Sequence, residues 1–245
     1  MALSTFFLAR HVFDIHLKAT ERTRRLGFSS SHLPLGYLEN FLPYEAISPL
    51  PRCRETESLS AEVCEWLDTD LPLSARPIDV SFVGEANQRR VAFFAGAASR
   101  LEKFECHLRL VPQIGPIKIE AQDRDLRTRL TAGISRRSKI VLNLHRDDSS
   151  YFEWHRIVLM GIWQRALVVS ETVTDAPPFV AGVDFVQSPL DEIPDAIEYY
   201  LRDPRGIQEA ERIRASGFQR LKEKCPLPAT LANVLRPFID APARS

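Results

Sequence analysis

Polar side chains close two apolar runs of the sequence, at the points where each run would end as a buried strand. The first run ends with Asn143, His145 and Arg146, and the second ends with Ser170 and Glu171. Because ligands of parallel α/β sheets bind at the carboxyl ends of the strands, we expect these side chains to cluster at one edge. Such a mixture of amide, imidazole, guanidinium, hydroxyl and carboxylate groups favours a polar ligand that carries charge.

A helix expected from Phe152 to Gln164 gives a second reason to place an anion at that edge. Its first backbone N–H groups carry a partial positive charge, which suits a diphosphate. Arg146 or Arg156 could add side-chain charge, and Glu171 could accept hydrogen bonds from ribose hydroxyls. Glu153 has two open interpretations, a ligand contact or a carboxylate that stabilises the first helical turn.

The elements that would position this edge alternate between short apolar runs and longer helical patterns, which is typical of βαβ units with a parallel sheet. Several of the runs are nearly continuous in apolar residues, so helices should cover both faces of the sheet. The expected strands are Ile78 to Val83, Cys106 to Val111, Lys139 to Leu144, Ala166 to Ser170 and Val183 to Val186. The expected helices between them are Gln88 to Lys103, Asp123 to Ile134 and Phe152 to Gln164.

Helical spacing continues in the last third of the chain. Leu190 to Leu201 and Ile207 to Lys222 carry apolar residues three to four positions apart, and Asp203 to Gly206 reads as a turn between them. We therefore expect a Rossmann-like α/β domain with C-terminal helices over residues 76–245.

The first 75 residues have a different character. A helix over His11 to Leu26 should end at Gly27, because glycine commonly follows a helix in the left-handed conformation. A proline-broken stretch follows, with one short helix near Ala61 to Leu67. Residues 1–75 are therefore expected to form an N-terminal helix and an irregular connector.

Composition and charge exclude several classes of protein. The chain has 32 basic and 32 acidic residues, so no net field draws it to nucleic acid or an anionic membrane. The cysteines form no CxxC pair and the histidines have no ligand-like spacing, which predicts free thiols and no metal site. We expect a cytoplasmic protein, because neither a signal peptide nor a transmembrane segment is evident. One arginine-rich stretch is expected to be a solvated helix face: Arg124, Arg127, Arg129, Arg136 and Arg137.

The motifs near the predicted edge occur in a recognisable order. From Lys139 the sequence runs through a strand ending Asn-Leu-His, a loop, a Phe-Glu-x-x-Arg helix and Val-Val-Ser-Glu. This order resembles the C-terminal domain of the spore-maturation-type glycosyltransferases, a group within the family one and family four GT-B enzymes. Leu159 and Gln164 depart from that pattern, since the family often has a glutamate and a glycine at these positions.

The resemblance extends upstream and covers most of the chain. Phe82-Val83-Gly84, followed by Asn87 and Arg89-Arg90, is similar to the family's strand, glycine and loop beside the donor phosphates. Arg89 and Arg90 have an open alternative as solvated residues that begin a helix. Overall, the similarity runs from about His11 to Lys224.

This resemblance implies the nucleotide-sugar-binding half of a GT-B fold, with the N-terminal Rossmann domain largely missing. It implies a metal-independent, hexosyltransferase-type enzyme without a cofactor, which takes a nucleotide-diphosphate sugar as donor and an undefined acceptor. No catalytic residue is assigned. The expected donor-binding residues are Gly84, Arg89, Asn143, His145, Arg146, Glu153, Arg156, Ser170 and Glu171.

Other functions remain open from the sequence. The chain could be a non-catalytic remnant or partner subunit that keeps the fold as an interaction module, or a partner chain could supply the N-terminal domain. A flavodoxin-like or receiver domain fits less well, because the first strand ends without an acidic cluster and no phosphate-loop glycine run is present.

Overall fold

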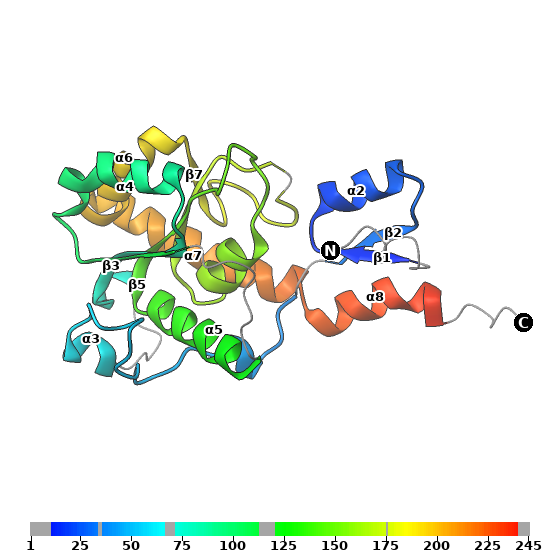
Figure 1. Cartoon of the computed structure of the whole chain (residues 1–245), viewed down its shortest axis with the longest axis horizontal. Helices are drawn as coiled ribbons and strands as arrows, with labels where there is room; N and C mark the ends of the chain where they lie inside the picture. Colours follow the sequence, from blue (N-terminus) through cyan, green and yellow to red (C-terminus); the bar gives the residue numbers. More distant parts are fainter. Residues whose placement is uncertain (1–10, 34–35, 67–71, 113–120, 175, 240–245) are drawn as a thin grey trace, which may run out of the picture. The chain divides into compact units, whose positions relative to one another are not determined.

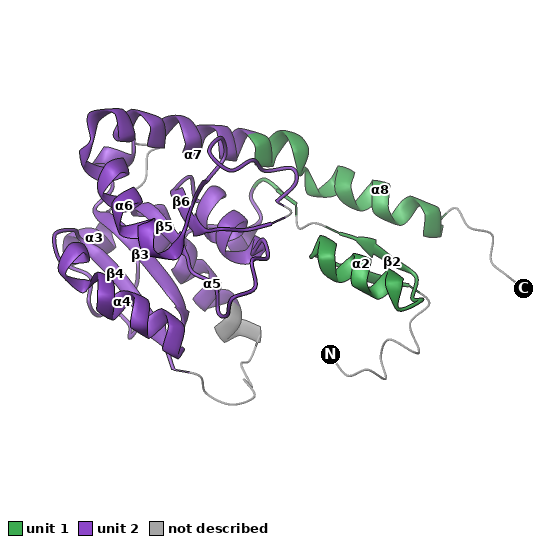
Figure 2. Cartoon of the chain, turned by 90° about the horizontal axis from the view of Figure 1, so that it is seen from above, with its two compact units in different colours: residues 1–39, 220–245 green, residues 40–219 purple. Residues whose placement is uncertain are grey.

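The computed structural model describes residues 11–33, 36–66, 72–112, 121–174 and 176–239 (Figure 1). The chain divides into two compact units, one formed by residues 1–39 with 220–245 and the other by residues 40–219 (Figure 2). The first unit therefore joins the two ends of the chain. The division at residue 75 that composition suggests remains a prediction about domains.

A five-stranded parallel sheet forms the centre of the larger unit, in the order β4-β3-β5-β6-β7. β3, the first strand of this sheet along the chain, lies between β4 and β5. The next strand, β4, is added on one side of β3, and the strands from β5 onward are added on the other side. The α/β fold with a parallel sheet is therefore confirmed. The strands are β3 Ile78–Glu85, β4 Cys106–Val111, β5 Ser138–Asn143, β6 Leu167–Glu171 and β7 Val186–Ser188.

Helices cover both faces of this sheet. In Figure 1, α4 (Gln88–Leu101) and α6 (Ile193–Arg202) lie on one side and α5 (Ala121–Arg136) on the other. The main core joins Phe94 of α4 and Ile197 of α6 to strand residues such as Leu142. This two-sided burial explains why the central strands read as continuous apolar runs.

The connector before the sheet is held in place by a buried arginine. Arg137 is 1% exposed and donates hydrogen bonds to the carbonyl oxygens of Ile47, Val63, Cys64, Trp66 and Gly133 and to Ser48 Oγ. The short elements along the connector are η1 Leu42–Tyr44, α3 Ala61–Glu65 and η2 Leu73–Ala75. The short helix expected near Ala61 is present, and Leu67 lies outside the described residues.

The expectation of a solvated arginine face is wrong for the end of α5. Arg127 is exposed, Arg129 and Arg136 are half-buried, and Arg137 is buried, while the side chain of Arg124 lies outside the described residues. Charge alternation along the sequence indicated solvent exposure, but Arg137 follows the last helical turn and meets the connector's carbonyl groups there.

Three other expected elements differ from the structure. Trp154–Ile162 is a π-helix, η3, in place of an α-helix from Phe152. Its wider turn is continued by the bond from Trp163 N to Val158 O. The turn expected from Asp203 is the start of α7 (Pro204–Lys224), where Asp203 Oδ1 accepts from Arg205 N and Gly206 N. The strand expected from Val183 begins three residues later, as β7 at Val186. The 3₁₀ helix η4 (Leu190–Glu192) lies between β7 and α6.

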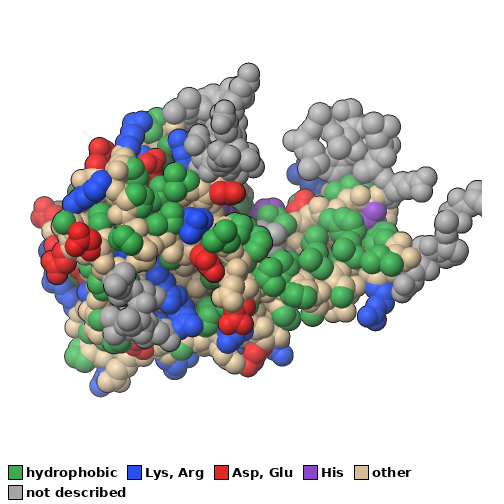
Figure 3. Space-filling model, turned by 90° about the horizontal axis from the view of Figure 1, so that it is seen from below, with side chains coloured by type: hydrophobic (Ala, Val, Ile, Leu, Met, Phe, Trp, Pro, Cys, Tyr) green, Lys and Arg blue, Asp and Glu red, His purple; other side chains and the backbone are tan. Residues whose placement is uncertain are grey.

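The smaller unit pairs β1 (Val12–Asp14) with β2 (Ser30–His32) in parallel, and α2 (Leu17–Arg25) connects them. The helix expected from His11 therefore starts later, because its first residues form β1. Gly27 follows α2 with φ +86°, which confirms the expected helix end. A further helix, α8 (Leu227–Ile239), has no fully buried residue, and apolar side chains gather over it in Figure 3.

Candidate functional site

An arginine–carboxylate pair spans the carboxyl edge of the sheet. Arg89, from the first turn of α4, donates to both oxygens of Glu171 at the end of β6, with Nη–O distances of 2.7 and 2.5 Å. The backbone N–H of His145 donates to Glu171 Oε1 at 2.7 Å. Hydrogen bonding with Glu171 raises the pKa of Arg89 above its ordinary value, although partial burial opposes this. Glu171 is 5% exposed, so its buried carboxylate is stabilised by the hydrogen bonds from Arg89 and from the backbone N–H of His145.

The end of β5 is joined to the end of β6 by side chains in register. Asn143 lies opposite Ser170 in the parallel pairing, and its Nδ2 donates to Ser170 Oγ at 2.9 Å. Ser170 Oγ donates in turn to the carbonyl oxygen of Glu171 at 2.7 Å. The register of two buried strands therefore aligns these polar groups, as the sequence predicts.

Two more arginines meet near the carboxyl ends of the neighbouring strands β3 and β5, between which the direction of strand addition reverses. Arg90 Nη2 and Arg156 Nη1 both donate to the carbonyl oxygen of Leu144, at 2.7 and 3.3 Å. Burial, followed by repulsion from Arg156, lowers the pKa of Arg90. This point of the sheet therefore concentrates positive charge at the place where doubly wound folds bind ligands.

Gly84 makes this arrangement sterically possible. Both guanidinium groups lie over the Phe82 ring, with Arg156 Cζ 4.9 Å and Arg90 Cζ 5.5 Å from its centroid. A Cβ at Gly84 would come within 2.7 Å of that ring and 3.1 Å of Arg156 Nη2. The glycine therefore leaves room for the stacked side chains.

Two of the predicted residues lie at the margins of the site. Glu153 precedes η3 and caps no N–H group with its side chain, but its Oε1 lies 3.5 Å from Arg156 Nη2. Arg146 is exposed and lies 3.4 Å from Glu85 in an ion pair. Because Arg146 is exposed, solvent screens its ion pair with Glu85.

Three buried acceptor positions at this edge are unfilled. Within the described residues, Asn143 Oδ1, His145 Nδ1 and Glu153 Oε2 have no hydrogen-bond partner. His145 Nε2 lies 3.2 Å from the carbonyl oxygen of Thr172, which can only accept, so the ring proton belongs on Nε2. In the neutral ring, Nδ1 is then an acceptor. Native structures rarely leave buried acceptors without partners, so this set is suited to a ligand that supplies hydroxyl donors.

Residues outside the predicted set also build the site. Arg90 is buried, and Asn87 both caps α4 through its Oδ1 and donates from Nδ2 to the Arg146 carbonyl oxygen at 2.9 Å. Tyr151 lies with its ring centroid 5.7 Å from that of His145. The Asn-x-x-Arg spacing after a strand is a recognisable capping signal for the first two, whereas nothing local indicates the position of Tyr151.

The described part of the chain gives no sign of a bound metal site. Among residues 11–239, without the gaps stated above, no three His, Cys, Asp or Glu side chains are grouped as ligands. All four cysteines are free thiols, and burial raises the pKa of Cys106 and Cys225 to about 11. No helix in the same ranges is both long and apolar enough to cross a membrane.

Comparison with known proteins was informative at the level of fold. No protein-family model matches the chain, and no curated protein matches it in sequence. HepE from Anabaena, in complex with UDP and glucose, is similar with a TM-score of 0.60 and 11% identity, over 95% of this chain and 64% of HepE. The HepE complex with UDP-glucose gives a TM-score of 0.58 at 10% identity.

Sucrose-phosphate synthase from Thermosynechococcus elongatus has a TM-score of 0.56 at 14% identity, over 94% of this chain and 58% of the synthase. The chain thus spans less than two thirds of the length of these proteins. The likeness shows that this chain shares a Rossmann-like α/β fold with these proteins. Membership of the spore-maturation group stays a prediction.

Proposed function

We propose that the chain binds a nucleotide-diphosphate sugar at the carboxyl edge of its five-stranded sheet. The observation that carries this proposal is the combination of unfilled buried acceptors with Arg90 and Arg156 at the strand-order reversal. Guanidinium groups suit the oxygens of a diphosphate, and unfilled acceptors suit the hydroxyl groups of a sugar. A nucleotide sugar carries both kinds of group in one molecule.

The Arg89–Glu171 pair is compatible with a ribose contact. Glu171 Oε1 accepts from Arg89 and from His145 N, while Oε2 accepts from Arg89 alone among the residues that the structure describes. A carboxylate oxygen has about two acceptor positions. Oε2 therefore has capacity for one hydroxyl donor without loss of the pair with Arg89. The HepE complexes with UDP and UDP-glucose, which share the fold of this chain, support the choice of a nucleotide sugar as the ligand.

The proposed reaction is transfer of the sugar, of hexosyl type, from the nucleotide diphosphate to an acceptor. In that step the acceptor oxygen forms a bond to the anomeric carbon, the bond to the diphosphate breaks, and the acceptor proton passes to a base. Arg156 would stabilise the negative charge that develops on the leaving diphosphate. The buried Arg90, whose guanidinium nitrogens donate to the carbonyl oxygens of Leu144 and Glu85, would add its charge without a direct contact, so no metal is required in the proposal. We assign the acceptor site and the base to a second, N-terminal domain, which belongs to the same polypeptide or to a partner chain. The proposed location of the protein is the cytoplasm.

Calorimetric titration of the chain with UDP, GDP and UDP-glucose tests the binding step. We expect saturable binding in the millimolar range or tighter, and a loss of about tenfold or more with Arg156→Gln, because a charge-assisted bond is removed. Arg205→Gln is the matched control, since Arg205 is exposed on α7. Absence of nucleotide binding by a folded wild-type chain would refute the proposal.

Release of free sugar or transfer to added acceptors tests the reaction separately. Binding without either reaction, even with a supplied N-terminal domain, would favour the alternative of a non-catalytic module. Thermal unfolding of each variant shows whether a lost signal reflects the site or the fold.

A further inference from the structure

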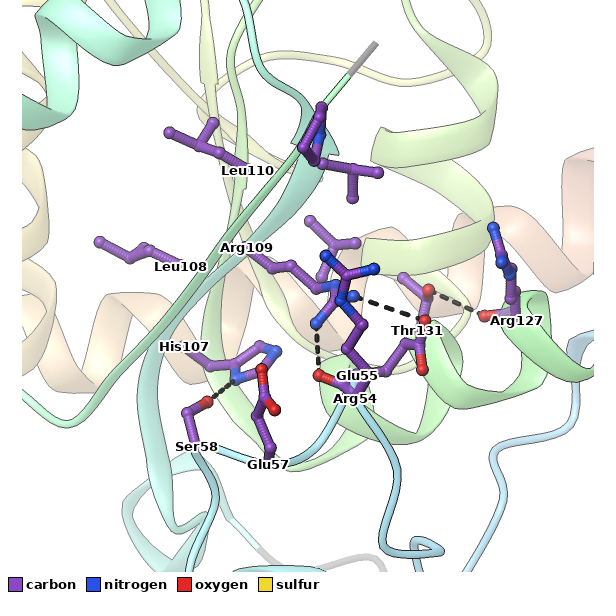
Figure 4. A pocket seen from close by; sticks show the side chains of 13 residues that line it. Arg54, Glu55, Glu57, Ser58, His107, Leu108, Arg109, Leu110, Arg127 and Thr131 are labelled. Atoms are coloured by element: carbon purple, nitrogen blue, oxygen red, sulfur yellow. Dashed lines mark hydrogen bonds and ion pairs between the residues drawn. The ribbon is translucent and has the colours of Figure 1, made fainter. Parts of the chain in front are cut away.

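A cavity lies beside the edge strand β4 of the sheet. It has a volume of about 520 Å³ and is lined by β4, by the connector at residues 54–58 and by α5. Figure 4 shows His107 and Arg109 on the side of β4 that faces the connector and α5, with Leu108 and Leu110 on the other side. The polar half of the strand is thus turned toward the cavity.

Arg109 fixes one wall of this cavity. Its Nη1 donates to the carbonyl oxygen of Arg54 at 2.6 Å, and its Nη2 lies 3.4 Å from Glu55 Oε1. The charges of Arg109 and Glu55 therefore offset each other. This pairing also positions the loop that carries the Arg54 side chain.

Two further arginines, Arg54 and Arg127, line the cavity, and the charge of Arg127 acts on Glu55 at longer range. The side chains of Arg54 and Arg127 are exposed, and neither makes an ion pair or hydrogen bond with another residue that the structure describes. They come from different elements, the connector and α5. Glu57 is the one further carboxylate among the lining residues, and it is exposed.

His107 supplies an unfilled buried position in the same wall. The residue is 4% exposed, its Nδ1 lies 3.3 Å from Ser58 Oγ, and its Nε2 has no hydrogen-bond partner among the described residues. Burial, reinforced by Arg109, lowers the pKa of His107 to about 4, so the ring is neutral at pH 7. In the tautomer in which the Ser58 hydroxyl donates to Nδ1, the ring proton is on Nε2, and Nε2 is a hydrogen-bond donor; the proposed binding mode uses this tautomer.

We propose that this cavity binds the phosphate group of a small phosphomonoester, through the guanidinium groups of Arg54 and Arg127 and the Nε2–H of His107. Two guanidinium charges match a phosphomonoester, which is close to dianionic at pH 7. Planar guanidinium forks also match phosphate geometry. The exposed carboxylate of Glu57 repels this ligand and limits its affinity.

This site is distinct from the proposed nucleotide-sugar site. The cavity lies on the α5 side of β4, whereas the nucleotide-sugar site is built from the carboxyl ends of β3, β5 and β6. None of Arg54, His107 and Arg127 hydrogen-bonds to the Arg89–Glu171 network in the described structure. A variant of one site should therefore leave binding at the other unchanged.

The test is calorimetric titration of the full chain at pH 7.5 with inorganic phosphate, ribose 5-phosphate and succinate. We expect ribose 5-phosphate to bind more tightly than inorganic phosphate, and succinate to bind more weakly than both. Arg54→Gln and Arg127→Gln should each weaken ribose 5-phosphate by about tenfold, as loss of one charge-assisted bond predicts. Glu57→Gln should tighten binding, while Arg205→Gln and Arg156→Gln should leave it unchanged.

A ¹⁵N NMR spectrum of the histidine rings provides the second readout. Saturation with ribose 5-phosphate should shift the Nε2 signal of His107 in the wild type, but not in the folded Arg54→Gln/Arg127→Gln double variant. Equal binding by wild type and double variant, preference for succinate, or loss of binding with Arg156→Gln would overturn the proposal. Preference for inorganic phosphate over the ester would contradict the ligand class.

Discussion

Two clusters of the larger unit use buried arginine in different ways. At the joint between connector and sheet, Arg137 donates to six described acceptors, five of them backbone carbonyl oxygens. At the carboxyl edge, Arg89 binds a carboxylate side chain, and nearby buried acceptors on Asn143, His145 and Glu153 are unfilled. The first cluster satisfies the backbone it touches, and the second leaves hydrogen-bonding capacity for another molecule.

The difference separates a structural cluster from a binding cluster without reference to residue type. The backbone carbonyl groups around Arg137 already accept hydrogen bonds, so a ligand is not needed to satisfy them. Removal of the arginine would leave these groups buried without a donor. Unfilled acceptors cost stability in the free protein, and in the proposed function a bound ligand satisfies those at the carboxyl edge. Four substitutions test this contrast, in order of decreasing effect.

The largest effect is expected at the saturated cluster. Arg137→Met should lower the free energy of unfolding by about 3–5 kcal/mol, because several buried carbonyl groups lose their donor at once. Urea denaturation measures this change, with Arg127→Met on the exposed part of α5 as control. A variant as stable as the wild type would show that the carbonyl groups find other partners.

The next largest effect is the pH dependence of stability that arises from the buried His107. Its pKa is about 4 in the folded protein and about 6.5 when unfolded, so the unfolded chain binds more protons between these values. The neutral ring's contribution is fully present above pH 6.5 and is lost as pH falls toward 4, by up to about 3 kcal/mol. Urea denaturation at several pH values should give a flatter pH dependence for His107→Gln than for the wild type. Parallel curves would contradict the assignment.

A smaller effect is expected at the carboxyl edge. Glu171→Gln removes the charge that Arg89 and the His145 N–H both contact, and should cost about 1–3 kcal/mol of stability. A double-mutant cycle with Arg89→Gln should give a coupling energy of about 0.5–3 kcal/mol. Additive losses in that cycle would mean that the pair does not hold the edge together.

The smallest effect is expected at the outer partner of the same arginine. Asp148 Oδ1 lies 3.2 Å from Arg89 Nε, but the Asp148 side chain is 99% exposed, so solvent screens the pair. Asp148→Asn should leave the unfolding midpoint in urea unchanged within error. A loss comparable to that of Glu171→Gln would remove the distinction between the two partners.

The carboxyl edge was accessible from sequence because it depends on strand ends. Continuous apolar runs located β3, β4, β5 and β6 to within a few residues, and parallel strands place their ends together. Asn143, His145, Ser170 and Glu171 therefore meet as predicted. Which of them pair with one another, and which acceptors stay unfilled, depends on side-chain geometry across three elements.

Other features had no local signal. The π-helical turn of η3 brings Gly161 so close to β6 that a Cβ there would lie 2.2 Å from Val168 Cγ2, a contact between distant elements. The pairing of β1 with β2 likewise depends on contact between separate segments of the chain, which overrides short-range periodicity.

By itself the sequence determined the α/β class, the approximate strands and the edge at which polar groups gather, because burial on two faces demands long apolar runs that are visible in one dimension. The tertiary structure decided the fate of each arginine. Arg137 is a buried donor, Arg89 is a partner of Glu171, and Arg54 and Arg127 line the cavity beside β4. A guanidinium group can donate to a carbonyl, a carboxylate or a phosphate oxygen, so its role follows from which acceptor the fold brings within reach.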